Sequence, residues 1–587
     1  MLIFDIETNG LLDTLTKLHV LVIYDTEDGS YKRYQITEES LKEGVNRLAN
    51  ASAIAGHNII GFDIPALMKL YPNFYPKGDV LDTLVLARLA WPDIKNQDFN
   101  RKDFDKKLIG SHSLKAYGHR LKILKGDFGE EADWSTWSQE MSDYCEQDVR
   151  VTVELMEKIK LKNLSAASIQ LEHSVQWIIQ RQIRHGFLFD EKKAELLYAI
   201  LVQRREDLRR DLETLFPPWL ANGGLFVPKK DNKSRKYLAG CPMSKLELTY
   251  FNPGSRDHIA FCLKKKYNWK PEVFTPSGKP KIDETVLSTL PYDEAKKLAE
   301  YFLLDKRLGQ LAGGEQAWLT SIGKDNRIHG YVNSNGAVTG RMTHSRPNVA
   351  QVPSVASPYG EECRELFKVP RGYKLVGCDA SGLELRCLAH YMAAYDDGAY
   401  ANEVVNGDIH TSNQMAAGLP TRNNAKTFIY AFLYGAGDEK IGKIIGKGKE
   451  AGARLKAKFF KATPAIKKLV DAVQTKARTQ GYLVGLDGRK LSIRAEHAAL
   501  NTLLQSAGAL IMKQYLVFLD RNLTTAGVDY EFVANIHDEV QMEVKESQAE
   551  LAATIATQTF AKVTEHFNFK CPLEGEAKIG NNWKETH

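Results

Sequence analysis

The sequence predicts an α/β domain at the N-terminus and, after it, a longer α+β region in which helices dominate. In the first 150 residues, strand-like apolar runs such as LHVLVIYD at 18–25 are mixed with helical spacing such as SDYCEQDVRVTVELMEKI at 142–159. From residue 169 onward helical patterns prevail, interrupted by strand-like pieces near Tyr373–Cys378 and Tyr530–Glu543. The two parts are therefore predicted to be built differently.

The length of the chain also argues for several domains, because 587 residues exceed the size at which one hydrophobic core stops growing. A polar and small-residue connector around Leu161–Ser168 predicts a boundary, which gives domains at 1–160 and 161–587. Two long amphipathic helices are expected between Ile169 and Phe216. A loop-rich insertion is expected at 217–249, where Pro-Pro, Gly-Gly and a basic run break the helical pattern.

The composition is that of an ordinary globular protein, with 43% hydrophobic and 26% charged residues. The sequence contains no uninterrupted apolar run long enough to span a bilayer and no secretory signal pattern. The protein is therefore expected in the cytosol, with no membrane partner. Seven cysteines without a C-x-x-C pair argue against a disulfide framework and against a zinc site.

The formal net charge of +6 is modest, but the basic residues are clustered. Runs of them occur at 229–236 (KKDNKSRK), at 264–266 and between 440 and 468. Solvated helix faces and loops would explain such runs about as well as a polyanionic partner would. A nucleic-acid backbone would use the same runs for attraction that does not depend on base sequence.

Two acidic strings in the second domain are candidate metal ligands. A buried strand is predicted to end at Asp379, where a rigid backbone can aim a carboxylate into a cleft. Asp538 and Glu539 follow His537 at a predicted hairpin turn between two short strands. Taken alone, an ordinary exposed turn explains the His-Asp-Glu string more often than a metal site does.

Between these strings lies a predicted helix that begins after Thr421 and stops at Gly435 and Gly437. Arg422, Lys426 and Tyr430 lie within about 80° of one another on one face, because four residues advance a helix by roughly 400°. Two cations followed by an aromatic ring would suit a triphosphate and its base. The alternative is an amphipathic helix whose long side chains extend into solvent.

A third set of carboxylates begins at the N-terminus. Asp5 and Glu7 share one face of a predicted strand, because strand side chains alternate. They mark either a metal site or an exposed strand end. Asp63 supplies another carboxylate, and Asp148 a fourth, with Tyr144 one helical turn before it on the same face.

Three strings in the second domain resemble motifs of one enzyme family. DASGLELR at 379–386, RNNAKTFIYAFLYGAG at 422–437 and HDEV at 537–540 look like motifs A, B and C of the family A DNA polymerases, in the expected order. SNGAVTGRMTHSRPNVAQVP, NGDIHT and LNTLLQSAGAL resemble the same family at the expected positions. Nearly the whole chain is similar to the replicative polymerases of podophages.

The resemblance implies an α+β polymerase domain shaped like a right hand. A helical thumb would occupy about 169–330, including the insertion at 217–249. The palm, with its sheet, would occupy about 331–409 and 480–587, and the helical fingers about 410–479.

The same resemblance assigns roles within the polymerase domain. Asp379 and Asp538 would bridge two metal ions, and the Ala380 carbonyl would be an extra ligand. Lys426 would bind a phosphate and could protonate the leaving group. The residues implied to bind the incoming nucleotide are Arg422, Lys426, Tyr430, His410 and Glu384. The residues implied to contact DNA are Arg341, Asn501, Gln505, His537 and Tyr434.

By the same resemblance, two of these positions determine which nucleotides are accepted. Tyr430 matches the position at which relatives with tyrosine accept dideoxynucleotides, whereas phenylalanine discriminates against them. Glu384 matches the residue that closes the site against a ribose 2′-hydroxyl. The minor-groove contacts suit fidelity without sequence preference, because every correct pair presents acceptors at similar places.

The N-terminal set resembles that of the DEDDy proofreading 3′–5′ exonucleases, whose fold is an RNase H-like mixed sheet with helices. By that resemblance Asp5, Glu7, Asp63 and Asp148 bind two metal ions, and Tyr144 orients the attacking water. Asp82 and His112 fall in stretches typical of the same family.

The resemblance therefore implies a DNA-templated DNA polymerase with a proofreading exonuclease that replicates phage DNA in the host cytoplasm. Each site would use two Mg²⁺ ions, for which Mn²⁺ could substitute. Primer-template DNA and dNTPs are the expected partners, and a replisome helicase-primase is a further candidate. The short insertion argues against a thioredoxin-type processivity factor. Two alternatives are a DEDDy nuclease with an inert polymerase-like clamp and a gap-filling repair polymerase.

Overall fold

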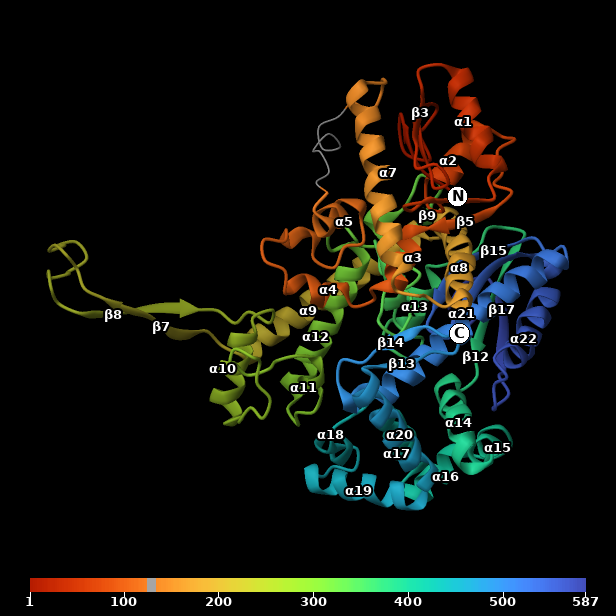
Figure 1. Ribbon diagram of the computed structural model, residues 1–587. Coiled ribbons are helices and arrows are strands. Elements are labelled where there is room, and N and C mark those ends of the chain that lie inside the picture. The colour runs from red at the N-terminus through yellow and green to blue at the C-terminus, as the bar shows by residue number, and fades with distance from the viewer. Residues whose placement is uncertain (124–132) are drawn as a thin grey trace. The chain divides into compact units, whose positions relative to one another are not determined.

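The structure is a computed structural model that describes residues 1–123 and 133–587 (Figure 1). Its contacts divide the chain into two compact units. Unit 1 combines Met1–Leu188 with His329–His587, and unit 2 is Phe189–Ile328. The two units are described separately below.

The N-terminal part of unit 1 is built on a five-stranded sheet in the order β3-β2-β1-β4-β5. The strands are β1 (Leu2–Thr8), β2 (Leu18–Asp25), β3 (Tyr31–Gln35), β4 (Ala53–Gly56) and β5 (Asp79–Asp82). β1 pairs antiparallel with β2 and parallel with β4, and β4 pairs parallel with β5. The predicted mixed α/β sheet is therefore confirmed.

Alternation along β1 gives this sheet two differently packed faces. Leu2, Phe4 and Ile6 enter one apolar core, whereas Ile3 enters the other, together with Cys145 and Val149 of α7 (Gln139–Lys160). Asp5 and Glu7 share the face of Ile3. Helix α7 therefore covers the face of the sheet on which the two acids lie. Among the described residues, the other α-helices here are α1 (Glu38–Asn50), α2 (Asp63–Leu70), α3 (Thr83–Ala90), α4 (Ile94–Phe99) and α5 (Leu114–Leu121).

The C-terminal part of unit 1 contains an antiparallel four-stranded sheet in the order β15-β16-β12-β17. These strands are β12 (Tyr373–Ala380), β15 (Tyr530–Ile536), β16 (Glu539–Lys545) and β17 (Gly575–Gly580). The predicted strand ending at Asp379 and the predicted hairpin around Asp538 are both confirmed. Short strand pairs β10 (Tyr331–Asn333) with β11 (Thr343–Ser345), and β13 (Tyr482–Val484) with β14 (Lys490–Ser492), lie outside this sheet.

Most helices of this part share one large apolar core with the second sheet. They are α14 (Leu383–Asp396), α15 (Ala399–Asn406), α16 (Ile409–Ala417), α17 (Arg422–Leu433), α18 (Asp438–Lys443), α19 (Lys449–Ala462), α20 (Pro464–Gln480), α21 (Ala499–Thr525) and α22 (Ala549–His566). The short helix α13 (Gly360–Glu365) is a further element of this part. The segment Glu496–Thr525, which contains α21, is long and apolar enough to cross a membrane by composition. However, 78% of its most apolar window is buried inside the protein, as in a core helix.

Helix α8 (Ala166–His185) contacts both parts of unit 1 through adjacent residues. The buried Glu172 carboxylate accepts from Lys513 Nζ on α21 at 2.6 Å and pairs with Arg489 Nη2 at 2.7 Å. The neighbouring His173 accepts, through Nε2, the backbone N–H of Asp82 at 2.8 Å. The short strand β6 (Phe187–Leu188) follows α8.

Unit 2 is mainly helical, with α9 (Glu191–Leu215), α10 (Arg256–Tyr267), α11 (Glu284–Ser288), α12 (Asp293–Ala312) and the short strand β9 (Arg327–Ile328). The predicted loop-rich insertion instead contains an antiparallel hairpin of β7 (Trp219–Phe226) and β8 (Met243–Thr249), drawn in Figure 1 as a long two-stranded arm. A register shift between Asn222 and Leu225 absorbs the Gly-Gly pair that had suggested a loop. The basic run at 229–236 is exposed in the connection between these strands.

Two candidate active sites

The five N-terminal site residues line one open cavity of about 560 Å³. Asp5 and Glu7 come from β1, Asp63 from the first position of α2, and Tyr144 and Asp148 from α7. The structure thus brings together carboxylates that lie up to 143 positions apart in the sequence. The rings of Tyr144 and Trp134 pack edge to face, with centroids 6.2 Å apart, which fixes the phenol at the cavity wall.

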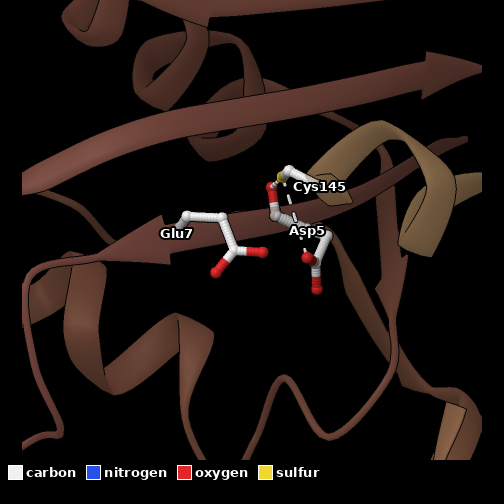
Figure 2. Close-up of side chains that lie close together, drawn as sticks. All are labelled: Asp5, Glu7 and Cys145. Carbon is white, nitrogen blue, oxygen red and sulfur yellow. Dashed lines mark hydrogen bonds between the residues drawn. The ribbon is translucent and has the colours of Figure 1, made fainter. Parts of the chain in front are cut away.

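Cys145 is a member of this site that sequence reasoning missed. Its sulfur, one carboxylate oxygen of Asp5 and one of Glu7 all lie within 4.8 Å of one another (Figure 2). The thiol donates to the Asp5 carbonyl at 3.4 Å and to Asp5 Oδ2 at 3.7 Å. Burial, reinforced by the nearby carboxylates, raises the pKa of this thiol well above its usual value. Cys145 therefore stays protonated and orients Asp5.

Asp63 is buried among other acids. Burial first, and then the charges of Asp82 and Asp148, raise the pKa of Asp63 to about 8. A cation bound beside these acids would neutralise the cluster and stabilise the charged form of Asp63. Crowded carboxylates on a rigid strand and helix are also the oxygen donors that hard divalent ions require. The residues present therefore fit a divalent metal site.

Asp82 and His112 have structural roles around this cavity. The Asp82 carboxylate accepts the backbone N–H groups of Asn58 at 2.8 Å and Ile60 at 3.1 Å, and it caps α3 at Leu84. It therefore shapes the loop that leads to Asp63. Burial, together with the charges of Arg88 and Arg120, lowers the pKa of His112 to about 3. Its neutral ring is hydrogen-bonded to the Tyr117 hydroxyl at 2.8 Å.

Replacing Asp63 with asparagine is expected to stabilise the metal-free protein at alkaline pH. Because the folded-state pKa is raised, folding takes up a proton between about pH 4 and pH 8, so stability falls as pH rises through that window. The substitution should raise the free energy of unfolding by a few kcal/mol, as an order of magnitude, at pH 8, and by less at pH 5. Thermal melts in EDTA at both pH values, with the exposed Glu39→Gln as control, measure this. Equal shifts at the two pH values would contradict it.

The second site lies at the edge of the C-terminal sheet. Asp379 stands near the end of β12, directly opposite Glu539 of β16, and Asp538 occupies the β15–β16 turn. The backbone N–H of Ala380 donates to the Asp538 carbonyl at 3.0 Å, which ties the two acidic segments together. Partial burial, and then the charges of Asp538 and Glu539, raise the pKa of Asp379 to about 7. The pKa of Asp538 is raised as well, by burial and by Glu384.

This pair also fits a divalent cation, because one or two carboxylates completed by backbone and phosphate oxygens are a common way to hold Mg²⁺. Glu539 behaves differently from its two neighbours. Its carboxylate accepts from Trp583 Nε1 at 2.5 Å and from Gln541 Nε2 at 2.6 Å, and it pairs with His587 at 3.2 Å. Burial would raise the pKa of Glu539, but His587, Arg364 and Trp583 hold it below its ordinary value. The Glu539 carboxylate is therefore already bound by groups of the protein.

The predicted helix between the acidic strings is α17, capped by Thr421, whose hydroxyl accepts from Asn424 N at 3.0 Å. Arg422 and Lys426 are exposed on it. Arg422 pairs with Asp408 at 2.8 Å. Burial, and then the charges of Arg422 and Lys426, lower the pKa of His410. These three basic groups therefore lie near one another.

The aromatic end of α17 meets the acidic site. The Tyr434 hydroxyl donates to Glu384 Oε1 of α14 at 3.1 Å. The rings of Tyr430 and His410 have centroids 6.4 Å apart. Burial, followed by the charges of Glu384 and Tyr434, raises the pKa of Tyr430 to about 12. Tyr430 thus lies near His410 on one side and near the Glu384 carboxylate on the other.

Apart from Tyr434, whose contact with Glu384 is given above, the predicted DNA contacts fall into two places. Arg341, His537 and Glu384 line one small cavity together with Asp538 and Glu539. Asn501 and Gln505 lie one turn apart on α21, where Gln505 Nε2 donates to Asn501 Oδ1 at 2.9 Å. Both residues are partly exposed.

Comparison with known proteins identifies the class. Residues 236–585 match the model of DNA polymerase family A, and residues 2–160 match the RNase H superfamily. The chain belongs to DNA polymerase family A. Its N-terminal part is an RNase H-like domain, so both folds implied by the resemblance are present on one chain.

Two phage proteins are similar to the chain over its full length. The DNA-directed DNA polymerases of Enterobacteria phage T3 and Escherichia phage T7 are 40% and 39% identical to it, covering all of both chains in each comparison. Both alignments run over 708 positions, so each relative contains segments that this 587-residue chain lacks. DNA polymerase I of Pseudomonas aeruginosa is 28% identical over 57% of this chain and 39% of its own length.

A solved structure shares the fold. The POL domain of Pol1 from M. smegmatis, in a complex with DNA primer-template and dNTP, superimposes with a TM-score of 0.76. The match covers 99% of this chain and 96% of the other, at 19% sequence identity. The predicted fold class is confirmed for both domains.

Proposed function

We propose that this DNA-directed DNA polymerase replicates phage DNA with two separate active sites. One, around Asp379 and Asp538, extends a primer; the other, around Asp5, Glu7, Asp63, Asp148 and Tyr144, removes nucleotides from the same primer's 3′ end. The observation that carries this proposal is the presence of two acidic clusters with raised pKa values, one on each of two unrelated sheets.

In the polymerase site, Asp379, Asp538 and the Ala380 carbonyl would hold the metal ions. When bound, such ions neutralise developing phosphate charge and lower the pKa of a coordinated hydroxyl. Arg422, Lys426 and His410 would bind the triphosphate, and Lys426 would donate a proton to the departing pyrophosphate. Arg422 would exchange its partner Asp408 for a phosphate when the nucleotide arrives.

The remaining residues would select the nucleotide and hold the duplex. Tyr430 would stack against the incoming nucleotide, and Glu384, fixed by the Tyr434 hydroxyl, would close the space beside the sugar against a 2′-hydroxyl. Tyr434 would pack near the templating base. Minor-groove acceptors of the paired primer end would receive hydrogen bonds from Arg341, Asn501, Gln505 and His537.

In the exonuclease site, the four carboxylates would hold the metal ions and Tyr144 would hold the attacking water. The Cys145 thiol would keep Asp5 in its orientation. We propose Mg²⁺, two ions per site, as the natural metal and Mn²⁺ as a substitute. Families of both kinds typically use divalent metals.

Primer extension with Mg²⁺ and four dNTPs, beside degradation of a single-stranded 3′ end, tests this proposal. Extension and degradation by the wild type are expected. Degradation without extension would indicate that the chain is a nuclease whose polymerase-like domain is an inert clamp. Extension limited to short gaps, with no synthesis on long templates, would favour a repair polymerase.

The proposed partners are primer-template DNA and dNTPs, the ligands named for the M. smegmatis complex. A replisome helicase-primase is a further proposed partner, and the host cytoplasm is the proposed location. The exposed basic run at 229–236 would contact the duplex backbone through charge alone.

We expect thioredoxin to leave the length of the extension products unchanged. The insertion at 217–249 is short, and unit 2 uses it for a single two-stranded hairpin. Product length on a long single-stranded template, with and without thioredoxin, measures this. An equal amount of an unrelated small protein is the control. A large increase with thioredoxin alone would contradict the expectation.

A further inference from the structure

We propose that Arg88, anchored by Tyr331, binds a phosphate of the primer strand in the exonuclease cavity. This inference rests on the proposed exonuclease function of that cavity. It adds a substrate-binding residue, and a second residue that positions it, to the acids and the tyrosine described above.

Arg88 lies on α3 and lines the same cavity as Asp5, Glu7, Asp63 and Asp148. Its side chain is only 8% exposed. Its Nη2 donates to the Tyr331 hydroxyl at 2.8 Å. Tyr331 begins β10 and also lines the cavity, so a residue from the C-terminal part of unit 1 forms part of this wall.

The guanidinium of Arg88 is incompletely satisfied. Among the residues that the structure describes, no hydrogen-bond acceptor reaches its Nε or Nη1. A buried cation without an anionic partner is costly, so its surroundings are expected to receive one. Nearby His112 is neutral, because burial and the charge of Arg88 lower its pKa to about 3, so Arg88 is the cationic group at this part of the wall.

A phosphate is the anion that this cavity needs to attract. Its described walls present four carboxylates, and Arg88 is the one lysine or arginine among them. Carboxylates repel a phosphodiester until cations bind, and they offer it no hydrogen-bond donor. A guanidinium has two planar edges that suit two phosphate oxygens, one formed by Nε–H with Nη2–H and the other by Nη1–H with Nη2–H. Tyr331 accepts one of the two Nη2 N–H groups, which anchors the guanidinium and leaves the other Nη2 N–H to complete one paired edge for the phosphate.

Arg88→Met tests the contact, with Arg150→Met as the matched control, since Arg150 lies exposed on α7 outside the cavity lining. Degradation of a single-stranded oligonucleotide should lose about tenfold or more in kcat/KM for Arg88→Met, mainly through KM, and little for Arg150→Met. Arg88→Lys should recover only part of the loss, because an ammonium lacks the fork.

Single methylphosphonate linkages locate the phosphate. Neutralising one of the last few linkages at the 3′ end should weaken wild-type degradation by a similar factor, whereas Arg88→Met should lose nothing further at that linkage. Tyr331→Phe should weaken degradation less than Arg88→Met and keep part of the sensitivity to that linkage. Additive losses at every linkage would overturn the proposal and leave Arg88 as a structural residue.

Binding separates this inference from the proposed function. Anisotropy of a fluorescent single-stranded oligonucleotide, with Ca²⁺ in place of Mg²⁺ to neutralise the carboxylates, measures binding apart from degradation. If the wild type did not degrade the oligonucleotide, the proposed exonuclease function would be wrong. If wild type and Arg88→Met bound the oligonucleotide equally, the proposed role of Arg88 would be wrong. Thermal melts of each variant show whether it is folded, and Arg88→Lys replaces Arg88→Met if the latter is not.

Discussion

Asp379→Ala is expected to reduce primer extension by roughly a thousandfold or more, the scale on which an electrostatic group acting only on the transition state contributes. The substitution removes one of two carboxylates that would hold both metal ions, and the neighbouring acids are engaged elsewhere, Glu384 by the Tyr434 hydroxyl. Glu539 stands directly opposite but is already occupied by Trp583, Gln541 and His587. Single-nucleotide incorporation under saturating dNTP measures the loss.

The same variant should degrade a single-stranded 3′ end at close to the wild-type rate, because Asp379 lies on a different sheet from Asp5 and Glu7. Exposed Glu550→Ala on α22 is a matched loss of one carboxylate away from both sites. If Asp379→Ala removed both activities while remaining folded, the two sites would not be independent.

The double substitution Asp5→Ala with Glu7→Ala should produce the reverse pattern. Both carboxylates stand on the face of β1 that α7 covers, and their removal leaves Asp63 and Asp148 to hold a metal alone. Loss of 3′ degradation by roughly a thousandfold or more is expected, with primer extension retained. Extension by this variant should also leave more mismatched primer ends in the product, which sequencing of the products measures.

Asp379→Ala and the double variant are controls for one another, since each keeps the site that the other lacks. Residual degradation in the double variant would place the nuclease chemistry elsewhere. Loss of extension in it would instead indicate that the N-terminal acids support the fold of the polymerase part.

Features that depend on local spacing were predicted well from the sequence. The strand ending at Asp379, the hairpin around Asp538 and the helix capped by Thr421 follow from side-chain periodicity and capping chemistry, which act within a few residues. The convergence of Asp5, Asp63 and Asp148 came from resemblance to a family, because local periodicity says nothing about how distant elements meet.

Contacts made by single side chains across long separations were missed. Cys145 touches Asp5 from 140 positions away, and Arg88 reaches Tyr331 across 243. Nothing in the spacing of either pair signals the contact. The insertion at 217–249 was misjudged for a different reason, because its Gly-Gly pair lies inside a strand at a register shift. Composition alone does not distinguish such a bulge from a loop.

The adjacent contacts of Glu172 and His173 have a practical consequence for dissecting this enzyme. Neighbouring residues point about 100° apart on a helix, so α8 holds the two parts of unit 1 with two different sides of the same turn. A nuclease fragment ending at residue 160 would lose the ring that accepts the Asp82 N–H, and with it the helix that covers this part of the domain. Asp82 in turn shapes the loop before Asp63. A separately expressed nuclease should therefore include α8. In that fragment Glu172, which pairs with Lys513 and Arg489 in the full chain, would be exposed to solvent.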